Sequence, residues 1–502
     1  MISDVKALIV VLVISAVIFR VAKPIALKFS SEQDYLRRRN VWFLLTITAF
    51  VSPSFWLYVL IAIPTLIWAG RRDSNPVALY LILLHVVPPI SIEIPVAMVH
   101  ALFDLDNYRL LSLFILIPTA LKLRKNDDPA RVRGLSAADV LLLGFGLLQV
   151  ALFVPPDLPN HVILADSFTN ILRRAFLFLI DVYLLFYVVS RSCSTRRAMV
   201  EAQAAFLLSS AIIAALSFFE FLRHWLLYVD IAARWTENPT AGFYLMRGDM
   251  VRAQVTSGHP LALGYLLAVA FGFWLYLKRH IESRWLRVGG TLLFWLGLLG
   301  AYSRGPWIGA IVAYFAYAAL GSRALLRLSK AAVVATFAIG VIAISPFSDR
   351  VVSVLPFMGG TIDSGSTGYR ERLAQRSWEL IKQSPLFGDQ LAYLKMEGLR
   401  QGEGIIDLVD TYAQVALFYG LSGLICFAGP MLIGLWRTLR RAWSNRGDAD
   451  LEHLGLSLAA SILGALTMLS AASFEFGIAK MYWALAALAA AYAAMRIPVQ
   501  ER

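Results

Sequence analysis

The chain is predicted to be an all-α, polytopic transmembrane protein of about 13–15 helices with one large loop outside the membrane. Three observations predict this class. Of its 502 residues, 59% are hydrophobic and only 16% are charged, and the mean hydropathy is +0.66. Apolar runs long enough to cross a bilayer recur along the whole sequence. Basic residues lie mostly in short loops between these runs, as the positive-inside rule describes.

The formal charge of +13 is therefore explained by membrane topology, and no nucleic-acid partner is expected. The two cysteines, Cys193 and Cys426, have no metal-like neighbours. Neither a disulfide framework nor a metal site is indicated, and no cofactor is expected. The run from Val5 to Phe19 lacks a small-residue cleavage site after it, so it is predicted to be an uncleaved first helix.

The whole chain, residues 1–502, is predicted to be a single membrane domain. Eleven apolar runs are predicted to span the bilayer, namely 5–21, 77–97, 106–121, 136–154, 172–190, 200–223, 261–277, 331–346, 409–436, 454–474 and 477–495. Regions 41–69 and 288–320 are interrupted, by Pro53 and by Ser303-Arg304-Gly305-Pro306. Seven basic stretches fall on the inside only if both interrupted regions are helical hairpins, which gives about 15 crossings, an outside N-terminus and an inside C-terminus.

This topology places residues 347–408 outside, as a large periplasmic loop. The loop has seven Lys and Arg against eight Asp and Glu, so it lacks the basic excess of the inside loops. Within it, Ser366 or Thr367 is expected to cap a helix that runs to Gln383 and is closed by Pro385 and Gly388. Its apolar stripe is predicted to comprise Tyr369, Leu373, Leu380 and Ile381.

Arginines mark three places at the outside ends of the predicted helices. Arg370 lies on one flank of the loop helix, and Arg372 and Arg376 lie on the other; this pattern also suits a solvated or membrane-surface amphipathic helix. Arg304 lies near membrane depth, where its partner is either a structural carboxylate or a ligand phosphate. The third place is a cluster of Arg247, Arg252 and His259, where His259 is either a base or part of a Gly-His-Pro turn that leads into a helix.

Carboxylates complete the set. Asp407 and Asp410 lie where the span near Val409 begins, and they either cap that helix or orient and deprotonate an acceptor hydroxyl. Glu220, near the outer end of its span, is expected to pair with an arginine.

These residues resemble elements of the O-antigen ligase and polymerase superfamily. The stretch Ser303-Arg304-Gly305-Pro306-Trp307-Ile308-Gly309 is similar to its Ser-Arg-Gly element. The segment from Thr367 to Gly388 looks like its large periplasmic loop, and Asp410-Thr411-Tyr412 with Tyr419-Gly420-Leu421-Ser422-Gly423-Leu424 resembles the segment that follows. The resemblance covers roughly residues 200–436. O-antigen ligases similar to this chain carry a histidine near the end of the loop, and no histidine falls within 347–408 here. This departure favours a polymerase of exopolysaccharide or O-antigen units over a ligase.

The resemblance implies a metal-independent glycosyltransferase of the GT-C type in the bacterial inner membrane, with an undecaprenyl-diphosphate-linked glycan as donor. Diphosphate binding is assigned to Arg252, Arg304 and Arg370, assisted by Arg372 or Arg376, and His259 is placed beside them in the substrate site. Asp410 or Asp407 would orient the acceptor. The expected partners are the lipid-linked oligosaccharide, membrane lipids, a chain-length regulator and export proteins. Rival hypotheses are a ligase to another acceptor, a polysaccharide or lipid transporter, and a non-catalytic subunit of a secretion complex.

Overall fold

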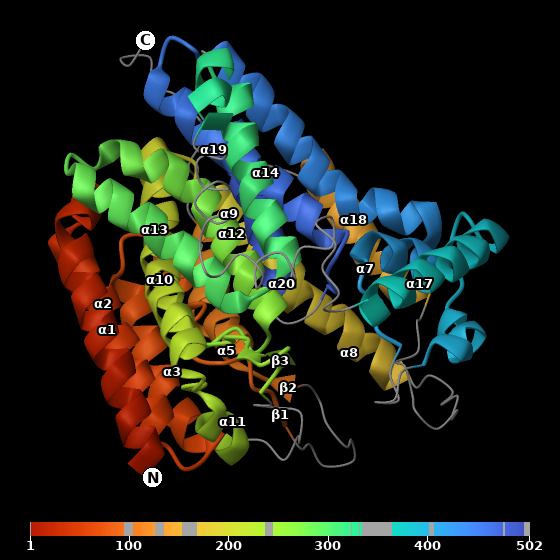
Figure 1. Ribbon diagram of the computed structural model, residues 1–502, viewed down its shortest axis with the longest axis horizontal. Coiled ribbons are helices and arrows are strands. Elements are labelled where there is room, and N and C mark those ends of the chain that lie inside the picture. The colour runs from red at the N-terminus through yellow and green to blue at the C-terminus, as the bar shows by residue number, and fades with distance from the viewer. Residues whose placement is uncertain are drawn as a thin grey trace.

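The computed structural model describes residues 2–94, 104–125, 135–152, 168–235, 244–322, 324–330, 332–333, 364–400, 406–474 and 477–495. The α-helices of the described part are α1 (Ile2–Ala26), α2 (Glu32–Val51), α3 (Phe55–Arg72), α4 (Pro76–Leu83), α5 (Asn107–Leu111), α6 (Ile117–Lys125), α7 (Ala137–Ala151), α8 (Phe168–Phe178), α9 (Leu184–Ser192), α10 (Arg196–Arg223), α11 (Val229–Trp235), α12 (Pro260–Leu277), α13 (Arg284–Ala301), α14 (Arg304–Leu320), α17 (Ser364–Gln383), α18 (Thr411–Ser444), α19 (Ala449–Leu469) and α20 (Gly477–Ala494). Figure 1 shows most of these helices in one bundle.

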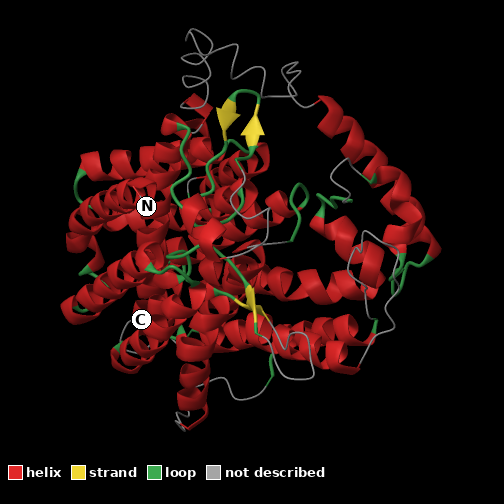
Figure 2. Cartoon of the chain, turned by 90° about the horizontal axis from the view of Figure 1, so that it is seen from below, coloured by secondary structure: helices red, strands yellow, loops and turns green. Residues whose placement is uncertain are grey.

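Short non-α elements complete the described part. Two π-helical segments, η1 (Ser112–Leu116) and η2 (Leu179–Tyr183), join α5 to α6 and α8 to α9. Two 3-10 segments are η3 (Lys278–His280) and η5 (Ala392–Leu399). Strands β1 (Ile92–Glu93) and β2 (Asp104–Leu105) pair antiparallel, as do β3 (Met246–Arg247) and β4 (Met250–Val251), which Figure 2 shows as small ribbons among helices. The predicted all-α, polytopic helical class is confirmed.

Six described helices are long and apolar enough to cross a membrane: Ser3–Ala26, Arg196–Arg223, Pro260–His280, Thr411–Ser444, Ala449–Leu469 and Gly477–Ala494. Nine of the eleven predicted runs coincide with helices or with continuous helical stretches. The predicted span 331–346 lies, except for residues 332–333, outside the described residues. The predicted number of crossings stays a prediction.

The predicted span 77–97 is wrong, because α4 ends at Leu83. Pro88 and Pro89 follow shortly after, and proline both lacks a backbone N–H and disfavours helical geometry in the residue before it. The chain instead turns and forms β1 at Ile92.

Both interrupted regions break where predicted. Ser54 caps α3 after the break at Pro53, and Ser303 is the residue before α14. Each interrupted region forms two helices, and α2, α3 and α13 extend beyond the apolar runs into the basic residues that flank them. Helix α2 has 20 residues, and α3 and α13 have 18 each. Helices α13 and α14 diverge, since α13 packs along α10 and α14 along α19.

The helix contacts define two ends of the bundle. The site end, at the bottom of Figure 1, holds α11 and the β-ribbons, where Trp235 donates to the carbonyl of Ser52 and Arg234 lies 3.5 Å from Asp4. The tail end holds the basic stretches. Here Arg38 forms ion pairs with Asp73 and Glu201. Arg196 pairs with Asp448, and Lys28 pairs with Glu282. The basic stretches 37–39, 71–72, 191–197, 278–287 and 437–446 therefore lie toward the same end, and the predicted sidedness stays a prediction.

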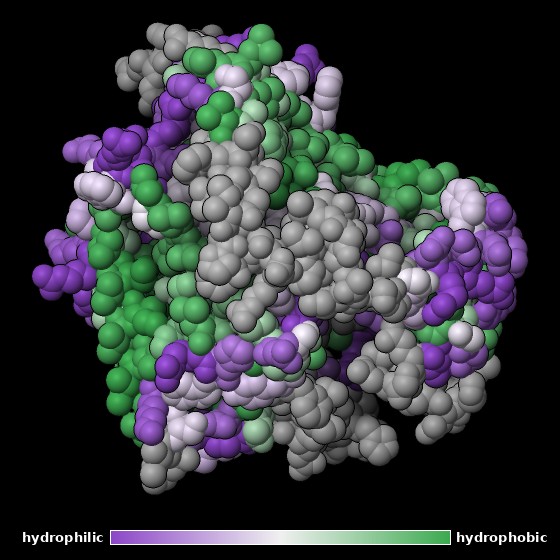
Figure 3. All heavy atoms as spheres, viewed as in Figure 1, coloured by the Kyte–Doolittle hydropathy of each residue, from purple (hydrophilic) through white to green (hydrophobic). Residues whose placement is uncertain are grey.

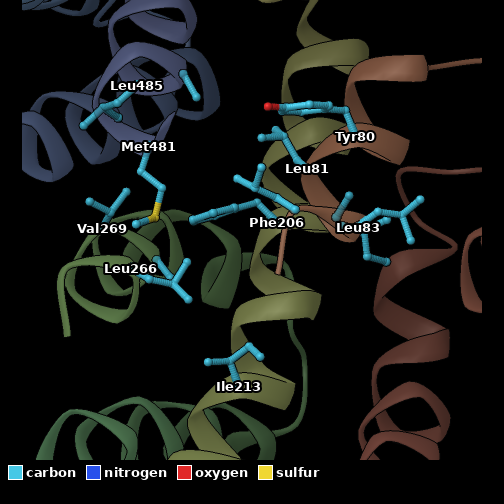
Figure 4. Packing of buried hydrophobic residues seen from close by; sticks show 14 of the residues in the cluster. Tyr80, Leu81, Leu83, Phe206, Ile213, Leu266, Val269, Met481 and Leu485 are labelled. Atoms are coloured by element: carbon cyan, nitrogen blue, oxygen red, sulfur yellow. The ribbon is translucent and has the colours of Figure 1, made fainter. Parts of the chain in front are cut away.

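Between the two ends the bundle has an apolar core. Figure 4 shows Leu81 of α4, Phe206 of α10, Val269 of α12 and Met481 of α20 pointing toward one another. Small residues let α10 and α13 approach closely, and the Ser217 hydroxyl donates to the Gly297 carbonyl at 2.8 Å. On the outside, hydrophobic surface covers much of the bundle, whereas the region around α17 is hydrophilic (Figure 3).

Candidate functional site

A buried carboxylate organises the site end. Glu220, at the end of α10, is fully buried and accepts backbone N–H bonds from Leu227, Gln254 and Val255 at 2.9–3.0 Å. The expected pairing of Glu220 with an arginine is therefore wrong. Its carboxylate instead satisfies the backbone of two loops and fixes the segment after β4 against α10. This role could not be predicted from the sequence, because the donors lie in separate loops.

The fixed segment carries Arg252 to the Ser-Arg-Gly turn. The Arg252 guanidinium donates to the Ser303 hydroxyl at 2.6 Å, and Arg247 donates to the Tyr302 carbonyl at 3.0 Å. The backbone is also joined, since Ala253 donates to the Gly300 carbonyl. Tyr302 has φ of 44°, so the chain reverses sharply between α13 and α14 and leaves Arg304 at the first position of α14. The structure thus brings two of the three predicted arginine places together.

His259 lies beside this group as the N-cap of α12. Its Nδ1 accepts from the backbone N–H of Leu261 at 3.2 Å, which is the turn role considered for it. Burial, with the nearby Arg252 charge, lowers the pKa of His259 to about 4, so the ring is neutral at neutral pH. The first turn of α12 touches α14, because a Cβ at Gly264 would lie 2.4 Å from Pro306.

The turn after α19, residues 470–474, joins the Ser-Arg-Gly turn to the predicted carboxylates. A Cβ at Gly305 would lie 3.7 Å from the Ala471 side chain, Thr411 donates to the Ala472 carbonyl at 2.6 Å, and Ser473 donates to Asp407 at 3.0 Å. One continuous set of contacts therefore runs from Arg252 to Asp407. The order of these residues in the sequence does not reveal it, because residues 470–474 carry no motif.

Asp410 caps α18. Its Oδ1 accepts the N–H groups of Tyr412 and Ala413 at 2.9 and 3.1 Å. Burial raises the pKa of Asp410 above its usual value, although these two donors act in the opposite direction. A carboxylate with a raised pKa is a better proton acceptor, so capping and proton transfer are compatible roles for this side chain.

The loop helix forms as predicted. Helix α17 ends at Gln383, and Leu373 and Leu380 are buried while Tyr369 and Ile381 pack beside them. The Tyr369 hydroxyl donates to the Asp407 carbonyl at 3.3 Å, which links α17 to the set of contacts above. Arg370 and Arg372 are exposed, whereas Arg376 bonds the Lys395 carbonyl and Glu379 within the same lobe, residues 364–400. These contacts of Arg376 therefore lie within the lobe and include neither Arg252 nor Ser303. The proposed N-terminal cap, Ser366 or Thr367, lies inside the helix, which begins at Ser364.

Two glycines lock this lobe onto α18. Gly388 and Gly420 both have positive φ, 71° and 64°, and Gly420 forms a kink within α18. The backbone of Leu421 donates to Pro385, and Asp389 donates to Leu417. A Cβ at Gly420 would lie 2.4 Å from Leu386, and one at Gly388 2.5 Å from Phe418, both against backbone atoms. The Pro-Leu-Phe-Gly and Tyr-Gly-Leu-Ser-Gly segments are thus the two halves of one joint.

These features define a helical membrane protein whose polar site lies where α12, α14 and α18 begin at one end of the bundle. Residues 289–428 match the family model described as O-Antigen ligase. This match extends from α13 to the middle of α18 and includes the Ser-Arg-Gly turn, α17 and both locking glycines. The resemblance to the O-antigen ligase and polymerase superfamily is confirmed for this part of the chain, which is narrower than the predicted 200–436. No curated protein matches the chain.

Proposed function

We propose that this protein is a polymerase that joins undecaprenyl-diphosphate-linked oligosaccharide repeat units into a surface polysaccharide, at the periplasmic face of the bacterial inner membrane. The observation that carries the proposal is the set of contacts that runs from Arg252 through Ser303 and residues 470–474 to Asp407. It places cationic side chains and carboxylates at the same end of the bundle. A glycosyl transfer from a diphosphate needs both kinds of group.

The reaction forms a bond between an acceptor hydroxyl oxygen and the anomeric carbon of the donor. The bond from that carbon to the diphosphate oxygen breaks, and the diphosphate leaves with its electron pair. Guanidinium groups stabilise the negative charge that grows on the leaving oxygen, and they match phosphate oxygens two at a time. In the proposal Arg252, Arg304 and Arg370 do this, with Arg372 or Arg376 assisting, in a GT-C type of mechanism without metal.

The acceptor proton must go to a base. Asp410 has its Oδ1 engaged by backbone N–H groups, and Asp407 has its Oδ1 engaged by Ser473. Each carboxylate has a second oxygen, and either one would orient the acceptor hydroxyl and take its proton. His259, whose pKa is lowered to about 4, caps α12 and lies near Arg252, so in the proposal it has a structural role in the site.

The choice of polymerase over ligase rests on the loop. No histidine occurs in residues 347–408, where similar ligases carry one. The donor and acceptor would both be lipid-linked repeat units, and a chain-length regulator and export proteins would act with the enzyme.

The test is a glycan ladder assay on purified protein with lipid-linked repeat units. Wild type should give a ladder, whereas Arg370→Ala and Arg304→Ala should abolish it while retaining the wild-type melting temperature. Lys382→Ala is the matched control, because this cation lies on the same helix and faces the ring of Trp378 at 6.0 Å. Transfer of a single glycan to another acceptor would show a ligase, and an inactive but lipid-moving wild type would show a transporter.

A further inference from the structure

A cavity of about 500 Å³ lies beside the candidate site. None of the proposed diphosphate-binding arginines or acceptor-orienting carboxylates lines it. Its walls come from α7, from α8 with η2, and from the N-terminal half of α18, together with Tyr393 of the lobe and Phe474 of the turn after α19. Small-molecule sites typically enclose about 300–1,000 Å³, so the cavity is large enough for a ligand rather than for a few waters.

The lining is aromatic. The ring centroid of Phe145 is 5.7 Å from that of Tyr419 and 5.6 Å from that of Phe427. Phe474 packs edge-on to Phe427 at 5.0 Å. Rings supply broad apolar faces with little conformational freedom to lose, and Tyr adds a hydroxyl at its edge.

Between the rings stand polar side chains that reach inward from three helices. Gln149 of α7 and Gln414 of α18 line the cavity, and within the described part of the chain neither side chain has a hydrogen-bond partner. Each carboxamide offers two donors and one acceptor. Arg174 of α8 lines the same space.

Asp181 also lines the cavity and is held by two cations. Its carboxylate accepts from Arg109 at 2.9 Å and from Lys480 at 2.7 Å, so η2 is tied to α5 and α20. Asp181 lies in the π-helical segment η2, and π-helical turns are frequent at functional sites. Asp181 is therefore held in place by helices of the bundle.

Flat apolar faces edged by amides and charged groups suit a pyranose ring. One face of such a ring presents C–H groups, and its rim presents hydroxyls that both donate and accept. An isoprenoid tail would leave Gln149 and Gln414 without hydrogen bonds in an apolar contact, which costs free energy.

The position of the cavity indicates which substrate would place its sugars there. Gln414 lies one helical turn after Asp410, and Phe474 follows Ser473, which bonds Asp407. The cavity thus adjoins the part of α18 that directly follows the two carboxylates. We propose that it is the acceptor glycan subsite, which holds the terminal sugars of the acceptor so that a hydroxyl reaches the Asp407–Asp410 segment. This inference rests on the proposed function.

Saturation-transfer NMR on the detergent-solubilised full chain tests it directly. The probe is the oligosaccharide mixture released by mild acid from the lipid-linked pool of the expressing cells. With wild type, saturation should be transferred from the protein to the ring protons of the bound sugars. A Gln149→Met, Gln414→Leu double variant should weaken sugar binding about fivefold to tenfold per lost hydrogen bond. The control is Gln375→Leu, an exposed glutamine on α17 that should bind as wild type does.

In the ladder assay the same double variant should raise KM for the acceptor more than it lowers kcat. Absence of saturation from wild type, or saturation that the double variant leaves unchanged, overturns the subsite. So does competition by sugar-free undecaprenyl phosphate, which would make the cavity a lipid site. If sugars bind but wild type gives no ladder, the polymerase proposal fails and the glycan site stands.

Discussion

Arginines at the two ends of the bundle have different partners. At the tail end, Arg38 is 3% exposed and forms two bonds to Asp73, at 2.9 and 2.6 Å, and an ion pair with Glu201 at 2.9 Å. At the site end, Arg252 donates to a serine hydroxyl, and Arg370 is exposed, with no ion pair among the described residues. A carboxylate cancels the charge of the arginine it binds, whereas an exposed guanidinium such as that of Arg370 keeps its charge accessible to an anion. The first arrangement serves the fold, and the second suits an anionic ligand.

The largest effect on stability is expected at Asp73. Replacing it with alanine leaves Arg38 buried without its principal partner, which should destabilise the protein by about 3–5 kcal/mol. The measurement is the melting temperature of the purified protein in detergent. As a control, Lys23→Ala removes an exposed pair with Glu32 and should cost less than about 1 kcal/mol. If the two variants melted alike, the tail-end cluster would not be a structural device.

The opposite pattern is expected at Arg370. Its replacement with alanine should leave the melting temperature unchanged, because the side chain is exposed. The rate of glycan transfer should fall by about 10²–10³, equivalent to about 2.7–4 kcal/mol of transition-state stabilisation. Arg370→Lys should remain impaired, since an ammonium cannot bind phosphate through two parallel bonds. Full activity of the lysine variant would remove bidentate recognition from the mechanism.

How far the sequence predicts the molecule depends on how local each feature is. The starts of α3 and α14 and the end of α17 follow from serines, prolines and the apolar stripe within one segment, so they were predictable. Glu220 bonds loops that lie 7 and 34–35 residues away, and the cavity joins α7 to α18. Such contacts depend on how helices pack, and periodicity within a segment contains no information about packing partners.

A change in the joint between the lobe and α18 is expected to affect both local stability and the rate of glycan transfer. In Gly420→Ala the new Cβ would meet the Leu386 backbone at 2.4 Å, and the positive φ adds strain of about 1–3 kcal/mol. We expect the lobe to separate from α18, with loss of transfer and faster hydrogen exchange over residues 364–400, while the tail end keeps its protection. Gly368→Ala is the control, since a Cβ there meets nothing within 4 Å. Equal exchange in both variants would contradict the joint.

A small effect on stability is also expected at Asp410, which has a counterpart at the tail end. Asp448 caps α19 with the same geometry, its Oδ1 accepting from Asp450 and Leu451 at 3.1 Å. Asparagine caps a helix about as well as aspartate, so neither Asp410→Asn nor Asp448→Asn should unfold its helix. Only Asp410→Asn should slow transfer, because the amide cannot accept the acceptor proton.

The dependence of the transfer rate on pH distinguishes the roles of Asp410 and Asp448. A raised pKa means that Asp410 becomes protonated at a higher pH than an ordinary aspartate, so wild-type activity should fall as the pH drops through that raised value. His259, with its pKa lowered to about 4, adds no step near neutrality. The acidic limb should persist in Asp448→Asn and vanish in Asp410→Asn. If Asp410→Asn kept both the rate and the limb of wild type, Asp410 would be a cap like Asp448, and the base would be Asp407, three residues earlier and held by Ser473.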